Sequence, residues 1–310
     1  MRAARFVVRA PATSANLGPG FDCAGVALEL WNELRVLPAE EGEPLVELEG
    51  EGADELPTDE THLALRAFAL SAPLEGRRFR FLNRIPLERG LGSSAATVAA
   101  GLLAGLTAGG EELSVDELLE LGLPLEGHAD NLAPALLGGA CLSWRSGERH
   151  QARRIATDLP LAAILVVPET RVNTTASRSR LPESLPHDEA ASQAAQAALL
   201  GAAIAAGDAD LLCAAFHDRL HEPYREPDAP LLTALRERPV VGQRAVTLSG
   251  SGPSVVVWAD KGKVEHAVSA LRERALGAAV IPLAVAARGT HALRFDAVES
   301  GAPARLGGAR

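Results

Sequence analysis

Short runs of apolar residues punctuate the first half of the chain, and most of them have the length of a β-strand. We predict strands near residues 5–10, 24–36, 45–49, 78–84, 139–144 and 161–167. Segments of helix-forming composition predict helices near residues 61–71, 93–107 and 114–122. The first half of the chain therefore predicts strands and helices that intermix along the sequence.

The second half has another order: helix, helix, strand, strand, helix, strand. Residues 189–206 are rich in alanine and end at Gly207, a natural helix C-cap, and Asp208 opens a second helix that stops before Pro223. The last three segments are a strand, a helix and a strand, at residues 255–258, 264–276 and 278–283. This mixture predicts α+β layers in each half.

A Gly/Ser-rich loop, residues 84–96, runs without a break into a predicted helix. Gly90 and Gly92 can take backbone angles that are closed to other residues, which lets main-chain N–H groups approach an anion. Ser93 and Ser94 stand where the helix begins, so hydroxyls, unpaired N–H groups and the positive end of the helix dipole converge there. The loop indicates a phosphate site, although it is not a Walker A sequence and a plain N-cap is the alternative.

Two more loops of small residues lie next to predicted strands. Residues 11–22 follow the first strand and read Pro-Ala-Thr-Ser-Ala-Asn-Leu-Gly-Pro-Gly-Phe-Asp. Residues 247–254 precede a later strand and read Thr-Leu-Ser-Gly-Ser-Gly-Pro-Ser. Three glycine-bearing loops at strand ends predict one shared site.

The composition is that of a soluble protein with a large core. The chain has 310 residues, of which 47% are hydrophobic, and this length suits two domains of ordinary size. The net charge of -10 and the absence of a basic block argue against a nucleic-acid partner, so any anion must be bound locally. Cys23, Cys141 and Cys213 are widely spaced, which indicates neither a disulfide framework nor a zinc knuckle.

The sequence shows no signal peptide and no membrane span. Only a short apolar stretch lies before Pro11, so we expect a cytoplasmic protein without a membrane partner. Residues 296–310 are rich in Gly, Ala and Arg and lack periodicity, which predicts a frayed tail. His217 and His221 have the i, i+4 spacing of a zinc-binding helix, but the glutamate and the third ligand of such a site are missing.

The three loops, in this order, resemble the motifs of the GHMP kinases, which are small-molecule kinases named for galactose, homoserine, mevalonate and phosphomevalonate. The first loop together with residues 127–139, Gly-His-Ala-Asp-Asn-Leu-Ala-Pro-Ala-Leu-Leu-Gly-Gly, resembles the homoserine kinase branch. The resemblance implies an α+β fold of two domains with the active site between them. Residues 1–155 would resemble the second domain of ribosomal protein S5, and residues 156–295 would form a ferredoxin-like plait.

The resemblance implies ATP as the phosphate donor, together with Mg²⁺. Ser94 and Glu126 would bind the metal, with Glu120 as the alternative carboxylate; one hydroxyl and one carboxylate suffice because Mg²⁺ keeps several waters and takes phosphate oxygens. His62 departs from the family pattern, since many homoserine kinases have Asn-Leu there, beneath the adenine. The implied ATP-binding residues are His62, Pro86, Leu87, Glu88, Arg89, Gly90, Leu91, Gly92, Ser93, Ser94, Ala95 and Ala96.

The resemblance also implies L-homoserine as the small-molecule acceptor. Arg178 and Arg225 would hold its carboxylate, because a planar guanidinium can bind a carboxylate bidentately. Asp22 would accept a hydrogen bond from the acceptor hydroxyl or pair with the ammonium group. The implied substrate-binding residues are Asn16, Asp22, His128, Asn131, Thr174, Arg178, Arg225, Gly250 and Gly252.

The implied catalytic residues, Asp22, Ser94, Glu126 and Asn131, include no strong base. In other branches of the family an aspartate aligns with Asn131 and a lysine with Thr13, and an amide cannot take a proton as a carboxylate can. We therefore expect the hydroxyl proton to leave late, to the γ-phosphate itself, and Asp22 to act by positioning.

The sequence thus predicts an ATP-dependent kinase that converts L-homoserine to O-phospho-L-homoserine on the way to threonine. One alternative is a GHMP kinase for another small hydroxylated metabolite, although a sugar has no carboxylate for Arg178 and Arg225. The other alternative is a non-catalytic ligand sensor, which would not need Ser94 and Glu126. The resemblance also suggests a homodimer.

Overall fold

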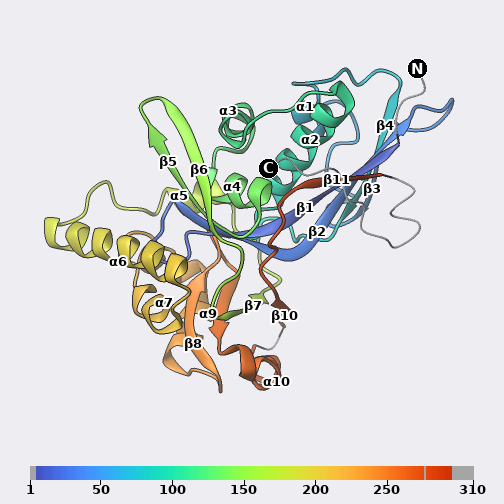
Figure 1. Cartoon of the computed structure of the whole chain (residues 1–310). Helices are drawn as coiled ribbons and strands as arrows, with labels where there is room; N and C mark the ends of the chain where they lie inside the picture. Colours follow the sequence, from blue (N-terminus) through green and yellow to red (C-terminus); the bar gives the residue numbers. More distant parts are fainter. Residues whose placement is uncertain (1–4, 276, 295–310) are drawn as a thin grey trace.

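Two β-sheets organise the chain in the computed structural model, which describes residues 5–275 and 277–294 (Figure 1). The first sheet has the strand order β11-β1-β2-β4-β3, and β5 and β6 extend it from β2. Its strands pair antiparallel except for β3 and β4. The strands are β1 Phe6–Ala15, β2 Ala24–Pro38, β3 Val46–Gly50, β4 Arg77–Asn83, β5 Ala140–Ser146, β6 Arg149–Ala156 and β11 His291–Arg294.

Four helices lie on one side of the first sheet (Figure 1). The longest of them, α2, is buried on two sides because its residues are small. Ala96, Ala100 and Ala104 belong to the core that contains the sheet, whereas Val98 and Leu102 pack with α3 and α4. The helices are α1 Leu63–Phe68, α2 Ser93–Gly109, α3 Val115–Glu126 and α4 Ala129–Leu137.

The second sheet has the order β10-β7-β9-β8, and all its pairs are antiparallel. Two neighbouring central strands, first and third along the chain, flanked by the fourth and the second, form the arrangement of a ferredoxin-like plait. The expected plait is therefore confirmed. The strands are β7 Ala162–Val167, β8 Gln243–Leu248, β9 Val255–Ala259 and β10 Ala279–Leu283.

Both faces of the second sheet are buried, as the nearly continuous apolar runs of β7 and β9 require. Ile164 and Val257 point to one face and pack in a core with residues of α9 and α10. Leu165 and Trp258 point to the other face and belong to the core that also contains α6, α7 and the first sheet. Because this core is continuous, the two halves of the chain are packed directly against each other.

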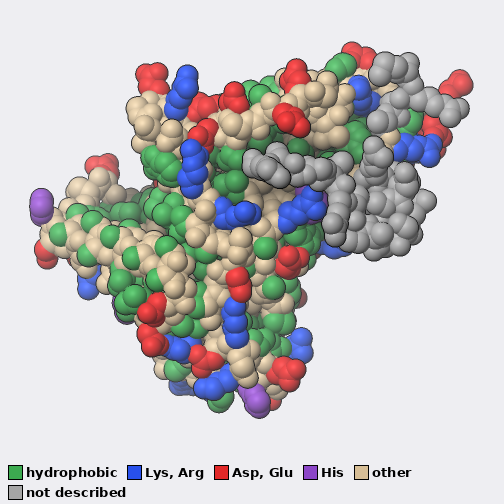
Figure 2. Space-filling model, in the orientation of Figure 1, with side chains coloured by type: hydrophobic (Ala, Val, Ile, Leu, Met, Phe, Trp, Pro, Cys, Tyr) green, Lys and Arg blue, Asp and Glu red, His purple; other side chains and the backbone are tan. Residues whose placement is uncertain are grey.

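The helices of the second half differ in length, from four residues in α8 to 20 residues in α6. Helix α6 extends along one side of the molecule, and Figure 2 shows hydrophobic side chains along it, with acidic and basic side chains interspersed elsewhere on that face. The helices are α5 Thr174–Arg178, α6 His187–Ala206, α7 Ala209–Ala215, α8 Glu222–Arg225, α9 Pro230–Glu237 and α10 Val264–Arg274, with 3-10 turns η1 Glu226–Asp228 and η2 Lys261–Lys263. Within the described residues no helix combines the length and apolar character needed to cross a membrane.

The predicted α+β class and the order of the main elements are confirmed, with two kinds of difference. Elements α4, β6, α5, α8, α9 and β11 were not predicted. The helix that opens at Asp208 ends at Ala215 rather than before Pro223. The cause is Asp218, whose carboxylate accepts hydrogen bonds from the backbone N–H groups of Leu220, His221 and Glu222 and so folds this segment into a turn.

The division into residues 1–155 and 156–295 stays a prediction. Residue 155 lies in β6, and β11 returns to pair with β1, so the last described strand belongs to the first sheet. The predicted tail at residues 296–310 lies outside the described residues, as do residues 1–4.

Close packing of α1 on α2 yields a stability prediction. A Cβ atom on Gly101 would overlap Ala64 O and lie 2.8 Å from Ala67 Cβ. Gly101→Ala should therefore lower the free energy of unfolding by roughly 1–3 kcal/mol, measured by urea denaturation. The matched control is Gly201→Ala in α6, where the nearest atom lies 3.7 Å away and the change should stabilise by up to about 1 kcal/mol. Equal stability of the Gly101 variant and the parent would contradict this packing.

Candidate active site

The three glycine-bearing loops meet, as the sequence predicted. Ser249 Oγ donates to Gly90 O over 2.7 Å and lies 2.9 Å from Ser14 Oγ, so one side chain touches all three loops. Backbone hydrogen bonds add to this contact: Gly250 N donates to Ala15 O over 3.2 Å, and Thr13 N donates to Leu91 O over 3.0 Å. The loops therefore form one surface rather than three separate turns.

Gly90 and Gly92 are required where the loops cross. Their φ angles are +72° and +65°, in the left-handed region that favours glycine. A Cβ atom on Gly90 would overlap Ser249 O, and one on Gly92 would overlap Thr13 Oγ1. Any side chain at either position would push the loops apart.

A cavity of about 590 Å³ opens beside the loop junction and contains most of the predicted site residues. Those that line it are Asn16, Asp22, His62, Pro86, Leu87, Glu88, Gly90, Leu91, Gly92, Ser93, Ser94, Glu126, His128, Asn131, Arg178, Arg225 and Gly250. Four predicted residues with described side chains do not line it. Arg89 donates to the carbonyls of Leu87, Pro168 and Glu169, Ala95 and Ala96 are buried in the core, and Gly252 faces Leu248. Thr174 lies in α5, and its side chain is outside the described residues.

The part of the cavity wall formed by the first turn of α2 can bind an anion. Helix α2 begins at Ser93, and its cap residue Gly92 makes no side-chain hydrogen bond to the first turn. The unpaired N–H groups of this turn and the hydroxyl-bearing residues Ser93, Ser94 and Thr97 thus face the cavity together with the positive end of the helix dipole. This arrangement suits a phosphate group.

His62 lies in the cavity wall and serves a structural purpose there. Its Nδ1 atom accepts a hydrogen bond from Ala64 N over 3.2 Å and so caps α1, while its ring packs on Phe81. Burial lowers the pKa of His62 to about 4, so the ring is neutral. Its contact with a nucleotide base stays a prediction. Sequence reasoning missed a nearby bidentate pair at the cavity wall, Arg171 with Glu55, at 2.8 Å for both contacts.

Glu126 is a buried carboxylate with an unsatisfied oxygen. Its side chain is 3% exposed, Oε1 lies 3.5 Å from His128 Nδ1, and Oε2 has no hydrogen-bond partner. The Glu126 carboxylate raises the pKa of His128 by hydrogen bonding to it. A buried anionic oxygen of this kind suits a cation. Glu120, the alternative, is 45% exposed and accepts a hydrogen bond from His150 N over 2.7 Å, away from the cavity.

Glu126 and Ser94, the two metal ligands that the resemblance implied, are of the residue types that can bind a magnesium ion. Both line the cavity beside the uncapped end of α2. No group of three or more His, Cys, Asp and Glu side chains that could hold a metal occurs in the described part of the chain. A metal here would therefore take most of its ligands from water and phosphate, as Mg²⁺ does.

Two guanidinium groups also line the cavity. Arg178 forms a fork-to-fork pair with Asp22, with Nη1 3.2 Å from Oδ1 and Nη2 in contact with Oδ2. Arg178 and Arg225 each lie 5.5 Å from the ring centre of Phe21. Phe21 was not predicted, although it stands next to Asp22 in the first loop. Its ring offers each cation a favourable cation–π contact.

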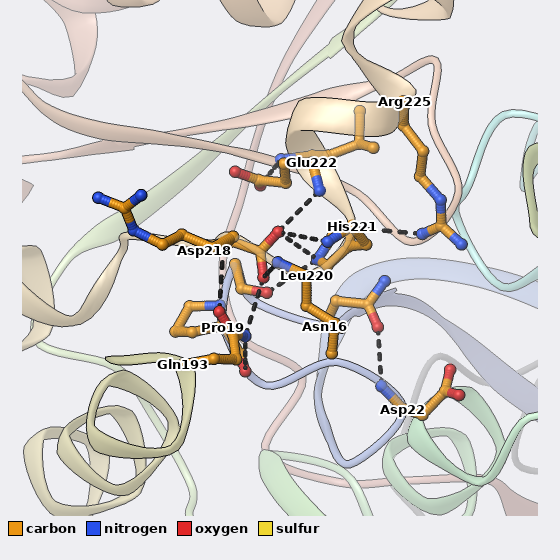
Figure 3. A network of polar contacts seen from close by, with 12 residues as sticks. Asn16, Pro19, Asp22, Gln193, Asp218, Leu220, His221, Glu222 and Arg225 are labelled. Carbon is orange, nitrogen blue, oxygen red and sulfur yellow. Dashed lines mark hydrogen bonds and ion pairs between the residues drawn. The ribbon is translucent and has the colours of Figure 1, made fainter. Parts of the chain in front are cut away.

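Arg225 is buried and held by a network of polar contacts (Figure 3). Its Nη1 atom lies 3.3 Å from His221 Nδ1 and donates to Gly250 O over 3.2 Å. His221 in turn lies 2.8 Å from Gly18 O through Nε2, and Asn16 Nδ2 donates to Gly250 O over 3.0 Å. Burial lowers the pKa of Arg225, and its Nε atom has no partner. The network thus fixes a cation that lacks one hydrogen bond.

The same network explains the histidine pair that resembles a zinc-binding helix. Both ring nitrogens of His221 already have partners, and the ring stacks on Phe21 at 5.1 Å. His217 lies in the turn after α7 and is exposed. The two residues are therefore not on one helix, and His221 supports Arg225.

Asn131 is paired with Thr13, the two positions at which the sequence departs from other branches of the family. Thr13 Oγ1 donates to Asn131 Oδ1 over 2.8 Å. The amide oxygen is thereby occupied, and the group that Asn131 can offer to the cavity is its N–H donor. Asn131 is thus suited to hold an oxygen atom and not to remove a proton.

Asp130, next to Asn131 in α4, is a cavity residue that sequence reasoning missed. It is 3% exposed, it lines the cavity, and its Oδ1 atom has no hydrogen-bond partner. Burial, with a smaller contribution from the charge of Asp22, raises the pKa of Asp130 to about 7. The other charged or titratable groups in electrostatic contact with it are Cys23, Glu126, His128, Arg178 and Arg225.

Comparison with known proteins places this fold and site in one family. Residues 60–139 match the model of the GHMP kinases N terminal domain, which is the class that the glycine loop and the two-sheet fold define. The chain is 41% identical over 313 residues to a homoserine kinase of Clavibacter michiganensis, covering 97% of each chain. The chain therefore belongs to the GHMP kinases, and its relatives there are homoserine kinases.

Two further relatives agree. A homoserine kinase of Streptomyces coelicolor is 42% identical over 302 residues, which cover 92% of this chain and 97% of the relative. The crystal structure of homoserine kinase from Cytophaga hutchinsonii superposes with a TM-score of 0.81 at 26% identity, covering 94% of this chain and 98% of that one. The resemblance stated from the sequence motifs is confirmed.

The raised pKa of Asp130 yields a prediction about stability. A carboxyl whose pKa is higher in the folded than in the unfolded state destabilises the fold increasingly as pH rises between those two values, here from about 4 to about 7. Asp130→Asn should therefore raise the free energy of unfolding of the ligand-free protein at pH 8 by roughly 1–3 kcal/mol, and the gain should shrink toward pH 5. Urea denaturation at both pH values measures this.

The control for this measurement is Glu120→Gln, which changes an exposed carboxylate and should leave stability nearly constant at both pH values. An Asp130→Asn protein less stable than its parent at pH 8 would show that the carboxylate stabilises the fold.

Proposed function

We propose that the chain transfers the γ-phosphoryl group of ATP to the side-chain hydroxyl of L-homoserine, forming O-phospho-L-homoserine on the route to threonine. The observation that carries the proposal is a single cavity that is lined both by the uncapped N-terminus of α2 and by Arg178 and Arg225. Relatives that are 41% and 42% identical bear the name homoserine kinase. We also propose that the protein acts in the cytoplasm and that it forms a homodimer.

The donor end would hold the phosphates of ATP. Main-chain N–H groups of the Gly90–Ser94 loop and the dipole of α2 face the cavity, and the glycines let the backbone approach an anion closely. Ser94 and Glu126 would hold Mg²⁺, which when bound neutralises charge on the phosphates. The unsatisfied Oε2 atom of Glu126 supports this assignment over Glu120.

The acceptor end would hold the amino acid by its carboxylate. Arg225 has an unpartnered Nε atom, and Arg178 contacts the same Phe21 ring as Arg225 does. A carboxylate bound there would complete the hydrogen bonding of Arg225 and be held against rotation by a second guanidinium. The two arginines therefore favour an acceptor that carries a carboxylate over a sugar.

Reaction at the hydroxyl would depend on positioning and charge. Asn131 can donate its N–H to the acceptor oxygen, because its own oxygen is bound by Thr13. In a loose transition state the attacking oxygen forms little bond before the leaving group departs, so the hydroxyl proton can pass to the transferred phosphoryl group without a side-chain base. Holding the two oxygens in line is then the main contribution of the site.

The test is ADP release from the purified protein with ATP and Mg²⁺, comparing L-homoserine, mevalonate, galactose, L-serine and L-threonine. We expect turnover with L-homoserine and none comparable with the others. Turnover with another acceptor would support the proposed kinase activity but contradict L-homoserine as its substrate. Binding of L-homoserine without turnover of any acceptor would favour the ligand sensor.

The proposed metal ligand has its own prediction. Glu126→Gln removes a charge next to the phosphates and should raise the Mg²⁺ concentration for half-maximal activity by roughly 10- to 100-fold. Glu120→Gln is the matched control, because Glu120 lies outside the cavity and should leave that concentration unchanged. A larger effect of the Glu120 change than of the Glu126 change would reverse the assignment.

A further inference from the structure

Asp130 is a buried carboxyl group in the cavity wall, and it has no role in the phosphoryl transfer proposed above. It is 3% exposed and lines the cavity, and its Oδ1 atom lacks a hydrogen-bond partner. No ion pair is formed by Asp130 within residues 5–275 and 277–294. An enclosed carboxylate oxygen that accepts no hydrogen bond is costly unless a ligand supplies the missing donor.

The other carboxyls of the cavity have partners or lie at the donor end. Asp22 is bound fork-to-fork by Arg178, and Glu55 is bound in the same way by Arg171. Glu126 contacts His128 and is the proposed metal ligand, and Glu88 is exposed. Asp130 is thus the cavity carboxyl near the arginines that is left to receive a cation.

The position of Asp130 suits a cation attached to the same carbon as a carboxylate. Its charge acts on both Arg178 and Arg225, which places it within electrostatic reach of the end that would hold the carboxylate. Asn131, the next residue of α4, also lines the cavity and can hold the acceptor oxygen. Carboxylate, ammonium and hydroxyl partners therefore surround one small volume.

The backbone of Asp130 is held firmly. A Cβ atom on Gly25 of β2 would overlap Asp130 O and lie 3.1 Å from Pro134 Cγ, so α4 is seated closely on this strand. On the other side, the bond between Thr13 and Asn131 ties the same turn of α4 to β1. A carboxylate on so rigid a support discriminates by geometry as well as by charge.

We propose that Asp130 accepts a hydrogen bond from the α-ammonium group of the acceptor and so selects amino acids over hydroxy acids that lack the amino group. This inference rests on the proposed function and adds a specificity residue to it. The role is one of recognition: binding the ammonium group supplies the donor that Oδ1 lacks and offsets the charge of Asp22 nearby.

The experiment compares L-homoserine with 4-hydroxybutyrate, the same molecule without its ammonium group, in the parent and in Asp130→Asn. The parent should show a much higher kcat/KM for L-homoserine. In Asp130→Asn the kcat/KM for L-homoserine should fall by roughly 10- to 100-fold, the range for a lost hydrogen bond to a charged group. The inhibition constant of 4-hydroxybutyrate against L-homoserine should change by less than about 3-fold.

Asp22→Asn is the matched variant, since Asp22 is the other carboxyl at this end. A selective loss for L-homoserine in Asp22→Asn and not in Asp130→Asn would overturn the proposal, as would an equal loss of affinity for both ligands in Asp130→Asn. If the parent phosphorylates none of the acceptors, the proposed function fails, and calorimetric binding of L-homoserine to the parent and to Asp130→Asn still tests the inference. Equal affinities there would contradict it.

Discussion

The contact between Gly90 and the loop that carries Ser249 and Gly250 is the constraint on which the site depends. Ser249 binds the carbonyl of Gly90, which fixes the phosphate loop, while Gly250 O accepts hydrogen bonds from Asn16 and Arg225. One short loop from the second half of the chain therefore contacts the Gly90 loop, the first loop and Arg225. The absence of a side chain at Gly90 is what allows this approach, because a Cβ atom would occupy the place of Ser249 O.

The charges in the cavity come from a few side chains, some of them buried, and these determine which ligand charges it can bind. The chain carries a net charge of -10, so anion binding must come from local groups. Arg225 provides a buried cation that is held by His221 and a carbonyl, while Arg178 is paired with Asp22 until a ligand competes for it. A zwitterionic acceptor brings both charges, so it can satisfy the arginines and a carboxylate without a net change in buried charge.

The sequence predicted the parts of this arrangement that are local. Glycine and serine loops next to apolar runs were sufficient to predict the phosphate loop, the order of the main elements and, through their resemblance to known motifs, the family. Phe21 and Asp130 were missed because their significance depends on partners more than 80 residues away, Arg225 among them. Sequence spacing could not separate Glu126 from Glu120 for the same reason: both lie in one helix, and the hydrogen bond from His150 N of β6 holds Glu120 away from the cavity. Strand β11 was missed because a four-residue strand has no periodicity of its own.

Thr13 and Asn131 show how a change of chemistry can be coupled across the site. A lysine and an aspartate at these positions, as the resemblance associates with other branches, would form an ion pair; here a hydroxyl donates to an amide instead, over 2.8 Å. Replacing only one member of such a pair would leave a buried charge or an unsatisfied polar group, so the two positions must change together. The result is a neutral pair at two positions that the resemblance associates with charged residues in other branches. Asp130, one residue away, can then keep a negative charge for recognition, because no second carboxylate at position 131 raises its cost further.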